Sequence, residues 1–86
     1  MPHFALTRQG YDQLIEVCGG SPPSPLWVNA DVLSSSELSE LRARGLEVTN
    51  FNRAIPFEGQ SLVDAIGIIE EHHPGLSIWV EHVVQP

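Results

Sequence analysis

Seven polar residues that could do chemistry stand directly after short apolar runs of the chain. They are Asn29 and Asp31, then Asn50, Asn52 and Arg53, and finally Glu81 and His82. Two carboxylates, a histidine and an arginine held close together could perform acid–base catalysis or bind a divalent cation. Polar residues also occupy strand ends because the chain returns to solvent there. The sequence therefore allows two interpretations. These residues form a functional site at the strand ends, called the rim below, or they are solvated and helix-capping side chains.

The apolar runs that precede these residues are typical of buried strands. The run 26–30 contains Trp27 and the run 76–80, which could extend to residue 84, contains Trp79. A short apolar run bounded by Pro or Gly predicts a strand that enters a loop. Residues 46–51 predict a further strand, and residues 3–7 predict a short edge strand. In open α/β sheets, ligands bind beyond the carboxyl ends of the strands.

The helix expected after the strand at 26–30 has clear boundaries. Ser34 and Glu37 form a capping box, which predicts a helix over 35–44. Gly45 stands where a left-handed residue ends such a helix. The following loop, residues 52–59, is longer than most connections and is therefore a candidate functional segment.

Two further helices complete the expected alternation. The first has apolar residues at helical spacing, Tyr11, Leu14, Ile15 and Cys18, and a pair of glycines ends it. The second is expected to begin at a Ser61 cap with Asp64 three residues later, and Pro74-Gly75 ends it. We expect one α/β domain over residues 1–86, a βαβαβαβ chain with a mostly parallel three- or four-stranded sheet and three helices.

The charge of the chain restricts its partners. Its 86 residues carry a formal net charge of −7, with four scattered arginines and no lysine, so no basic stripe is expected. Binding to DNA, RNA or an anionic membrane is not expected, because it depends on Lys and Arg. The acidity serves solubility or favours a basic protein partner. Neither a leader nor a membrane span is expected, which makes the cytoplasm the default compartment.

Five side chains that do not belong to the strand-end set are expected to have structural roles, and for the two tryptophans an interface is the alternative. Cys18 is expected to be a buried thiol on the apolar face of its helix. His72 and His73 are expected to lie at a helix end, where they complement the dipole and do not form a metal site. Trp27 and Trp79 are expected in the core, or on an open sheet face where exposed aromatic residues mark an interface.

Parts of the chain between residues 26 and 82 resemble small PIN-like proteins of the Mut7-C type. The resembling segments are 26–31 followed by 41–48, the segment 61–66 and the segment 78–81. The resemblance implies a ribonuclease that holds Mg²⁺ with carboxylates, here Asp31, Asp64 and Glu81. Two positions depart from that pattern: Asn29 stands where the first acid belongs, and Glu81-His82 replaces Thr-x-Asp. A member with these changes would have weakened or lost catalysis.

Three functions remain open from the sequence. The leading one is a non-catalytic protein-interaction module without a cofactor, whose partner is another protein or a second copy in a homodimer. Binding would then involve Trp27 and Trp79 or the residues Asn29, Asn52 and Arg53. The second is the PIN-like, Mg²⁺-dependent nuclease, with Asp31, Asp64, Glu81 and His82 as weak catalytic candidates. The third is a binder of small anionic ligands at the strand-end rim, where Arg53 would meet the anion.

Overall fold

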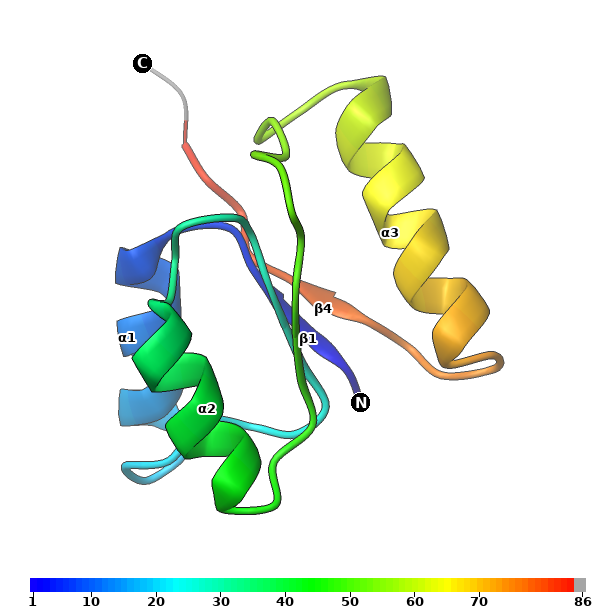
Figure 1. Ribbon diagram of the computed structural model, residues 1–86. Helices are drawn as coiled ribbons and strands as arrows, with labels where there is room; N and C mark the ends of the chain where they lie inside the picture. Colours follow the sequence, from blue (N-terminus) through cyan, green and yellow to red (C-terminus); the bar gives the residue numbers. More distant parts are fainter. Residues whose placement is uncertain (85–86) are drawn as a thin grey trace.

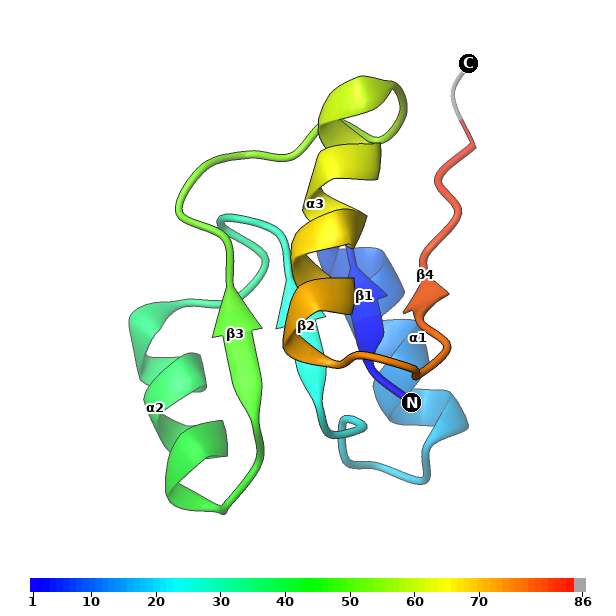
Figure 2. The ribbon, with the colours of Figure 1, turned by 90° about the vertical axis from the view of Figure 1, so that its right-hand side faces the viewer.

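The structure, a computed structural model, describes residues 1–84 and contains a four-stranded parallel sheet. Its elements are β1 (His3–Ala5), α1 (Arg8–Val17), β2 (Leu26–Val28), α2 (Ser35–Ala43), β3 (Val48–Asn50), α3 (Gln60–His72) and β4 (Trp79–Val80). The order in the sheet is β3-β2-β1-β4, and all neighbouring strands run parallel (Figures 1 and 2). The expected α/β class is confirmed.

Helices cover both faces of the sheet. Figure 1 shows α1 and α2 on one side and α3 on the other. Leu26 and Val28 point toward α1 and α2, whereas Phe4 and Trp27 point toward α3. Two buried clusters result, and each holds one helical layer to the sheet by burial of apolar side chains.

The strand order places a change of direction in the middle of the sheet. The chain builds β1, β2 and β3 outward in one direction, and α3 then crosses the other face so that β4 pairs with β1. The expectation that the first strand lies at an edge is therefore wrong, because β4 covers that side of β1. The carboxyl ends of β1 and β4 flank the point where ligands bind in doubly wound sheets.

The helix α2 has the ends that its sequence predicts. The Ser34 hydroxyl accepts from Glu37 N, and the Glu37 carboxylate accepts from Ser34 N, which completes the capping box. Gly45 N donates to Arg42 O, and Leu46 N donates to Leu41 O. These two bonds form a Schellman motif at the glycine.

Other element boundaries differ from the expectation. All four strands are shorter than their apolar runs, and β4 has two residues. The N-cap of α3 is Gly59, with a φ of 89° and no side-chain cap, so Ser61 lies inside the helix. Asp64 instead accepts a hydrogen bond from the Gln60 side chain, one turn earlier.

The two tryptophans occupy different environments. Trp27 is 5% exposed and lies in the core under α3, whereas Trp79 is 39% exposed on β4. The expectation that Trp79 lies in the core is wrong, because β4 is the edge strand of the sheet and the Trp79 side chain lies beside His3, outside the cluster that α1 and α2 bury. Cys18 is also exposed rather than buried, since it is the C-cap residue, one position beyond the last turn of α1.

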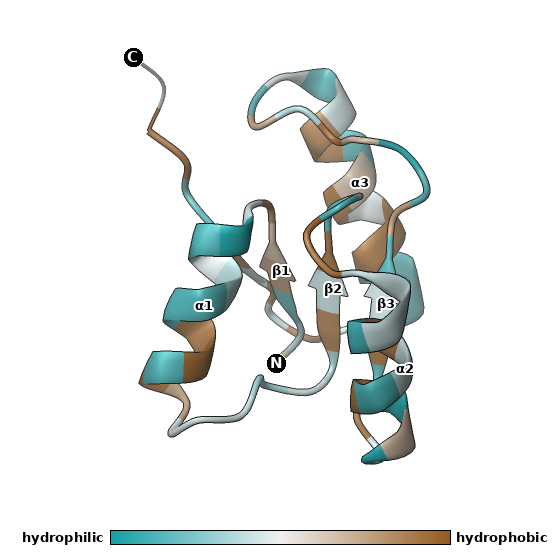
Figure 3. Ribbon diagram, turned by 60° about the vertical axis from the view of Figure 1, so that its left-hand side comes forward, coloured by the Kyte–Doolittle hydropathy of each residue, from teal (hydrophilic) through white to brown (hydrophobic). Residues whose placement is uncertain are grey.

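Helix α3 is the most apolar of the three helices, as Figure 3 shows by its brown segments. Its Ala65 and Ile69 are buried against the sheet, while Val63 and Ile68 are exposed. No helix in residues 1–84 is long and apolar enough to cross a membrane.

Candidate functional site

Glu81 fills the point where the sheet changes direction. Its Oε1 accepts from Leu6 N at 2.7 Å and from Thr7 N at 2.9 Å, and its Oε2 accepts from the Thr7 hydroxyl at 2.6 Å. Thr7 is the N-cap of α1, and its hydroxyl also accepts from Gly10 N. The carboxylate therefore lies at the positive end of α1, where it satisfies donors that precede the helix.

The glycine at position 10 makes room for this carboxylate. A Cβ atom built on Gly10 would overlap the carboxylate carbon and both oxygens of Glu81. The close approach of helix and carboxylate thus requires a residue without a side chain at position 10. The hydrogen bonds of Glu81 thus hold the segment after β4 against the start of α1.

The Asn29 side chain is buried and hydrogen-bonded within the protein, so it does not face solvent at the strand ends. The residue is 4% exposed, and its Oδ1 accepts from Ile55 N at 2.7 Å and from Ala30 N at 2.8 Å. Its Nδ2 donates to Ile55 O at 2.9 Å and to Leu6 O at 3.3 Å. These bonds tie the end of β2 to the long loop between β3 and α3 and leave no atom of the amide group free for a ligand.

Five further candidate residues line two neighbouring hollows. Arg53 and Asp64 line a cleft of about 630 Å³ between that loop and α3. Asp31, with a φ of 65°, and Asn50 line a neighbouring hollow of about 340 Å³, and Asn52 borders both. Glu81 follows the opposite edge of the sheet from Asn50, three strand spacings away, or about 14 Å.

The three acids of the PIN-like pattern are not gathered. Glu81 is committed to Leu6 and Thr7, and Asp31 and Asp64 line different hollows. Among residues 1–84, no group of three or more His, Cys, Asp or Glu residues could hold a metal ion. His82 is exposed after β4.

The two histidines at the end of α3 contact Trp27. The Trp27 indole N–H donates to His73 Nε2 at 3.2 Å, and the His72 ring lies 5.3 Å from the indole, centroid to centroid. His72 Nδ1 lies 2.9 Å from Ile68 O. Both histidines therefore cover the core tryptophan at the helix end.

The outer edge of β4 is open. Trp79 N donates to Pro2 O at 2.9 Å, and Glu81 N donates to Phe4 O at 3.0 Å. Since successive residues of a parallel strand direct their backbone groups to alternate sides, Val80, which lies between Trp79 and Glu81, directs its N–H and C=O away from β1. Within residues 1–84, no strand pairs with that side of β4.

A groove runs beside this open edge, between β4 and α3. Its volume is about 570 Å³, and its lining combines apolar side chains with one acid, chiefly Ile66, Ile78, Val80, Glu70 and His73. On the other face of β4, the Trp79 ring lies against His3, with ring centroids 5.7 Å apart. The edge of β4 therefore has an apolar contact surface on each face.

The opposite edge of the sheet is blocked. Arg42 of α2 donates from Nε at 3.1 Å and from Nη2 at 2.9 Å to Val48 O. Leu26 N donates to Glu47 O, and Phe51 N donates to Val28 O, so Glu47 and Phe51 direct their backbone groups toward β2. Because successive residues alternate in direction, the carbonyl of Val48 points away from β2. A charged side chain that occupies an outward carbonyl hinders the pairing of another strand.

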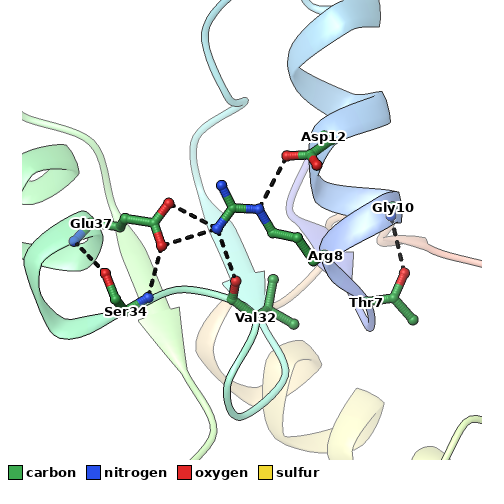
Figure 4. Close-up of polar contacts among 7 residues, drawn as sticks. All are labelled: Thr7, Arg8, Gly10, Asp12, Val32, Ser34 and Glu37. Atoms are coloured by element: carbon green, nitrogen blue, oxygen red, sulfur yellow. Dashed lines mark hydrogen bonds and ion pairs between the residues drawn. The ribbon is translucent and has the colours of Figure 1, made fainter.

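An ion-pair network joins the starts of α1 and α2 (Figure 4). Arg8 Nη1 lies 2.8 Å from Glu37 Oε2, and Arg8 Nε lies 3.2 Å from Asp12 Oδ1. The pKa of Glu37 is lowered, first by the hydrogen bond from the Ser34 backbone and then by the bond from Arg8. This exposed network links the starts of the two helices beside the carboxyl ends of β1 and β2.

The groove beside β4 and the contact between Glu81 and Thr7 were not predicted from the sequence. Ile66 and Glu70 lie on α3 at a spacing of four, and only the pairing of β4 with β1 brings them beside Val80. The expected strand over residues 3–7 includes Thr7, whereas Thr7 is the N-cap of α1, three residues before Gly10, a position that threonine favours. Its contact with Glu81 spans almost the whole chain and has no local signal.

No protein-family model, no curated protein and no solved structure matches the chain.

Proposed function

We propose that this chain is a non-catalytic protein-interaction module that binds an extended segment of a partner protein along β4. The observation that carries the proposal is the open edge of β4, where the backbone groups of Val80 face away from β1. An extended segment can add to such an edge as a fifth strand through main-chain hydrogen bonds. The blocked edge at β3 supports β4 as the side where pairing occurs.

The groove beside β4 supports the same mode of binding. Alternate side chains of an added strand point to opposite faces of the sheet. Those on the α3 face would enter the groove against Ile66 and Val80, and those on the other face would contact Trp79. Main-chain bonds then supply affinity, and the groove supplies specificity.

Charge selects the class of partner. The chain has a net charge of −7, and Glu70 provides the carboxylate inside the groove. A basic extended segment is attracted to such a surface, whereas two copies of the chain repel each other. The partner is therefore a basic, extended peptide segment, and a homodimer through β4 is the competing outcome.

The proposal is tested by NMR titration with an octapeptide of alternating lysine and valine. We expect backbone amide shifts along 78–82 and on the α3 residues of the groove, and weaker binding of a glutamate–valine octapeptide. Val80→Pro removes one outward donor without removing either bond from Trp79 or Glu81 to β1, so it should abolish binding. Glu70→Lys provides a second test: it should weaken binding more than Glu40→Lys on α2, which changes the net charge by the same amount away from the groove.

Three results would overturn the proposal. The first is equal binding of the two octapeptides, and the second is a set of shifts that avoids β4. The third is a concentration-dependent dimer in sedimentation experiments that Val80→Pro dissociates, because it would assign the edge to a second copy of the chain.

A further inference from the structure

The cleft between the β3–α3 loop and α3 is a second surface, separate from the groove at β4. It is lined by loop residues 51–56 and by Ser61, Asp64, Ala65 and Ile68 of α3, and it shares no residue with the groove. In Figure 2, the loop rises from β3 and arches across to the start of α3. Its volume of about 630 Å³ lies within the range of small-ligand sites, about 300–1,000 Å³.

The loop that forms one wall is held in a fixed conformation. The Asn29 amide bonds both the N–H and the C=O of Ile55, at 2.7 and 2.9 Å, and the Ile55 side chain is buried. Long loops that are anchored at their middle can present side chains without losing much entropy on binding. The backbone on both sides of Ile55, including Arg53, is therefore preorganised.

Arg53 is the one arginine of residues 1–84 without a polar partner. The other three bind Asp12 and Glu37, the carbonyl of Val48, or the hydroxyl of Ser21. The guanidinium group offers a planar pair of N–H donors that fits a carboxylate. In a chain with so few cations, an unused guanidinium group at a cleft indicates a place for an anionic group.

Asp64 lines the same cleft and does not pair with Arg53 in the described structure. One of its oxygens accepts from the Gln60 side chain, which leaves the other for a donor. The rest of the lining is mainly apolar, with Phe51, Ala54, Ile55, Pro56, Ala65 and Ile68. The cleft thus offers a cation, an anion and an apolar wall within one hollow.

We propose that this cleft binds a small zwitterion with an apolar body, of the class of free apolar amino acids. Its carboxylate would bind Arg53, its ammonium group would bind Asp64, and its side chain would lie on the apolar wall. Both charged residues are exposed, so binding is expected at millimolar concentrations.

The test is an NMR titration of the full chain with L-phenylalanine at millimolar concentrations. Phenylacetate, which lacks the ammonium group, and phenethylamine, which lacks the carboxylate, serve as comparison ligands. We expect L-phenylalanine to bind most tightly and to shift amides of residues 51–56 and of the start of α3. Arg53→Gln should weaken its binding by about tenfold, the value of one charge-assisted interaction.

Matched variants separate this site from non-specific charge effects. Arg44→Gln removes a remote exposed arginine and should leave binding unchanged, and Asp64→Asn should weaken phenethylamine but not phenylacetate. The proposal is overturned if L-phenylalanine produces no shift in the cleft, if Arg44→Gln weakens binding as much as Arg53→Gln, or if phenylacetate binds as tightly as L-phenylalanine. Shifts at β4 alone would overturn it too, without affecting the groove proposal.

Discussion

At the scale of single residues, Asn29 shows how one buried polar group can organise a rim. Its type and place after a buried strand suggested a ligand position, but its amide is fully used inside the protein. A carboxylate at this position, as the PIN-like pattern requires, would face two carbonyl oxygens that now accept from Nδ2. The hydrogen bonds of Asn29 therefore account for an amide at this position.

Asn29→Asp is accordingly expected to destabilise the fold. The substitution replaces a donor to Leu6 O and Ile55 O by an acceptor, and buries a charge with no cation beside it. We expect a loss of about 2–4 kcal/mol in the free energy of unfolding, measured with urea. Asn50→Asp is the control, because its Nδ2 bonds only the neighbouring Phe51 O in a partly exposed place. Equal losses for the two variants would contradict this assignment.

Gly10 and Glu81 are expected to behave as one unit. Gly10→Ala should displace the Glu81 carboxylate from Thr7, and Glu81→Ala should remove the same bonds directly. Each change should cost about 2–3 kcal/mol, the range for hydrogen bonds to a charged group. The double variant should lose little more unfolding free energy than Glu81→Ala alone, because without the Glu81 carboxylate the alanine side chain at position 10 overlaps nothing. Additive losses in urea unfolding would show that the two positions act independently.

At the scale of elements, the boundaries of a helix can be predicted from the sequence where the residues that set them lie close together in the chain. The ends of α2 were predictable because the capping box and Gly45 lie within the helix and its first flanking residues. The start of α3 was not, because Gly59 caps it through backbone conformation and without a side-chain bond. The exposure of Trp79 depends on which helices cover β4, and the chain near Trp79 carries no information about that.

The capping box of α2 leads to a pH prediction. The pKa of Glu37 is lower in the folded protein than in the unfolded chain, because Ser34 N and then Arg8 bond its carboxylate. The folded state therefore binds fewer protons, and the contribution of Glu37 is lost as the pH falls from the usual glutamate range through this lowered pKa. Wild-type protein should lose more stability over that interval than Glu37→Gln, as measured by thermal unfolding.

Arg8→Gln separates the two causes of this shift. The backbone bond from Ser34 is the larger one, so the variant should keep most of the pH dependence that Glu37→Gln removes. If Arg8→Gln and Glu37→Gln gave identical pH profiles, the ion pair in Figure 4, and not the cap, would control the pKa of Glu37.

At the scale of the whole molecule, the sheet order decides which predicted residues meet. The sequence indicated parallel strands and a rim at their carboxyl ends, and both were derivable from strand–helix alternation. The crossing of α3 to the other face was not derivable, because each crossover allows either neighbour of the sheet as its destination. That one choice separates Glu81 from Arg53, buries β1, and makes β4 the open edge.

The net charge of the molecule gives the last prediction, which concerns how fast a basic segment associates with β4. A charge of −7 attracts a cationic peptide over distances that salt screens, with a Debye length of about 10 Å at 0.1 M. The association rate of the lysine–valine octapeptide should therefore fall by roughly tenfold between low and high salt, as read from NMR line shapes. Its dissociation rate should change little, because main-chain bonds and groove contacts act at short range.

Charges far from β4 should contribute to this rate. Glu16→Lys and Glu40→Lys together change the net charge by +4, from −7 to −3, at exposed positions of α1 and α2. The double variant should bind the octapeptide more slowly at low salt and show a smaller salt dependence, with the same dissociation rate. A salt effect confined to dissociation would instead mean that local ion pairs such as one at Glu70, rather than the field of the whole molecule, hold the peptide.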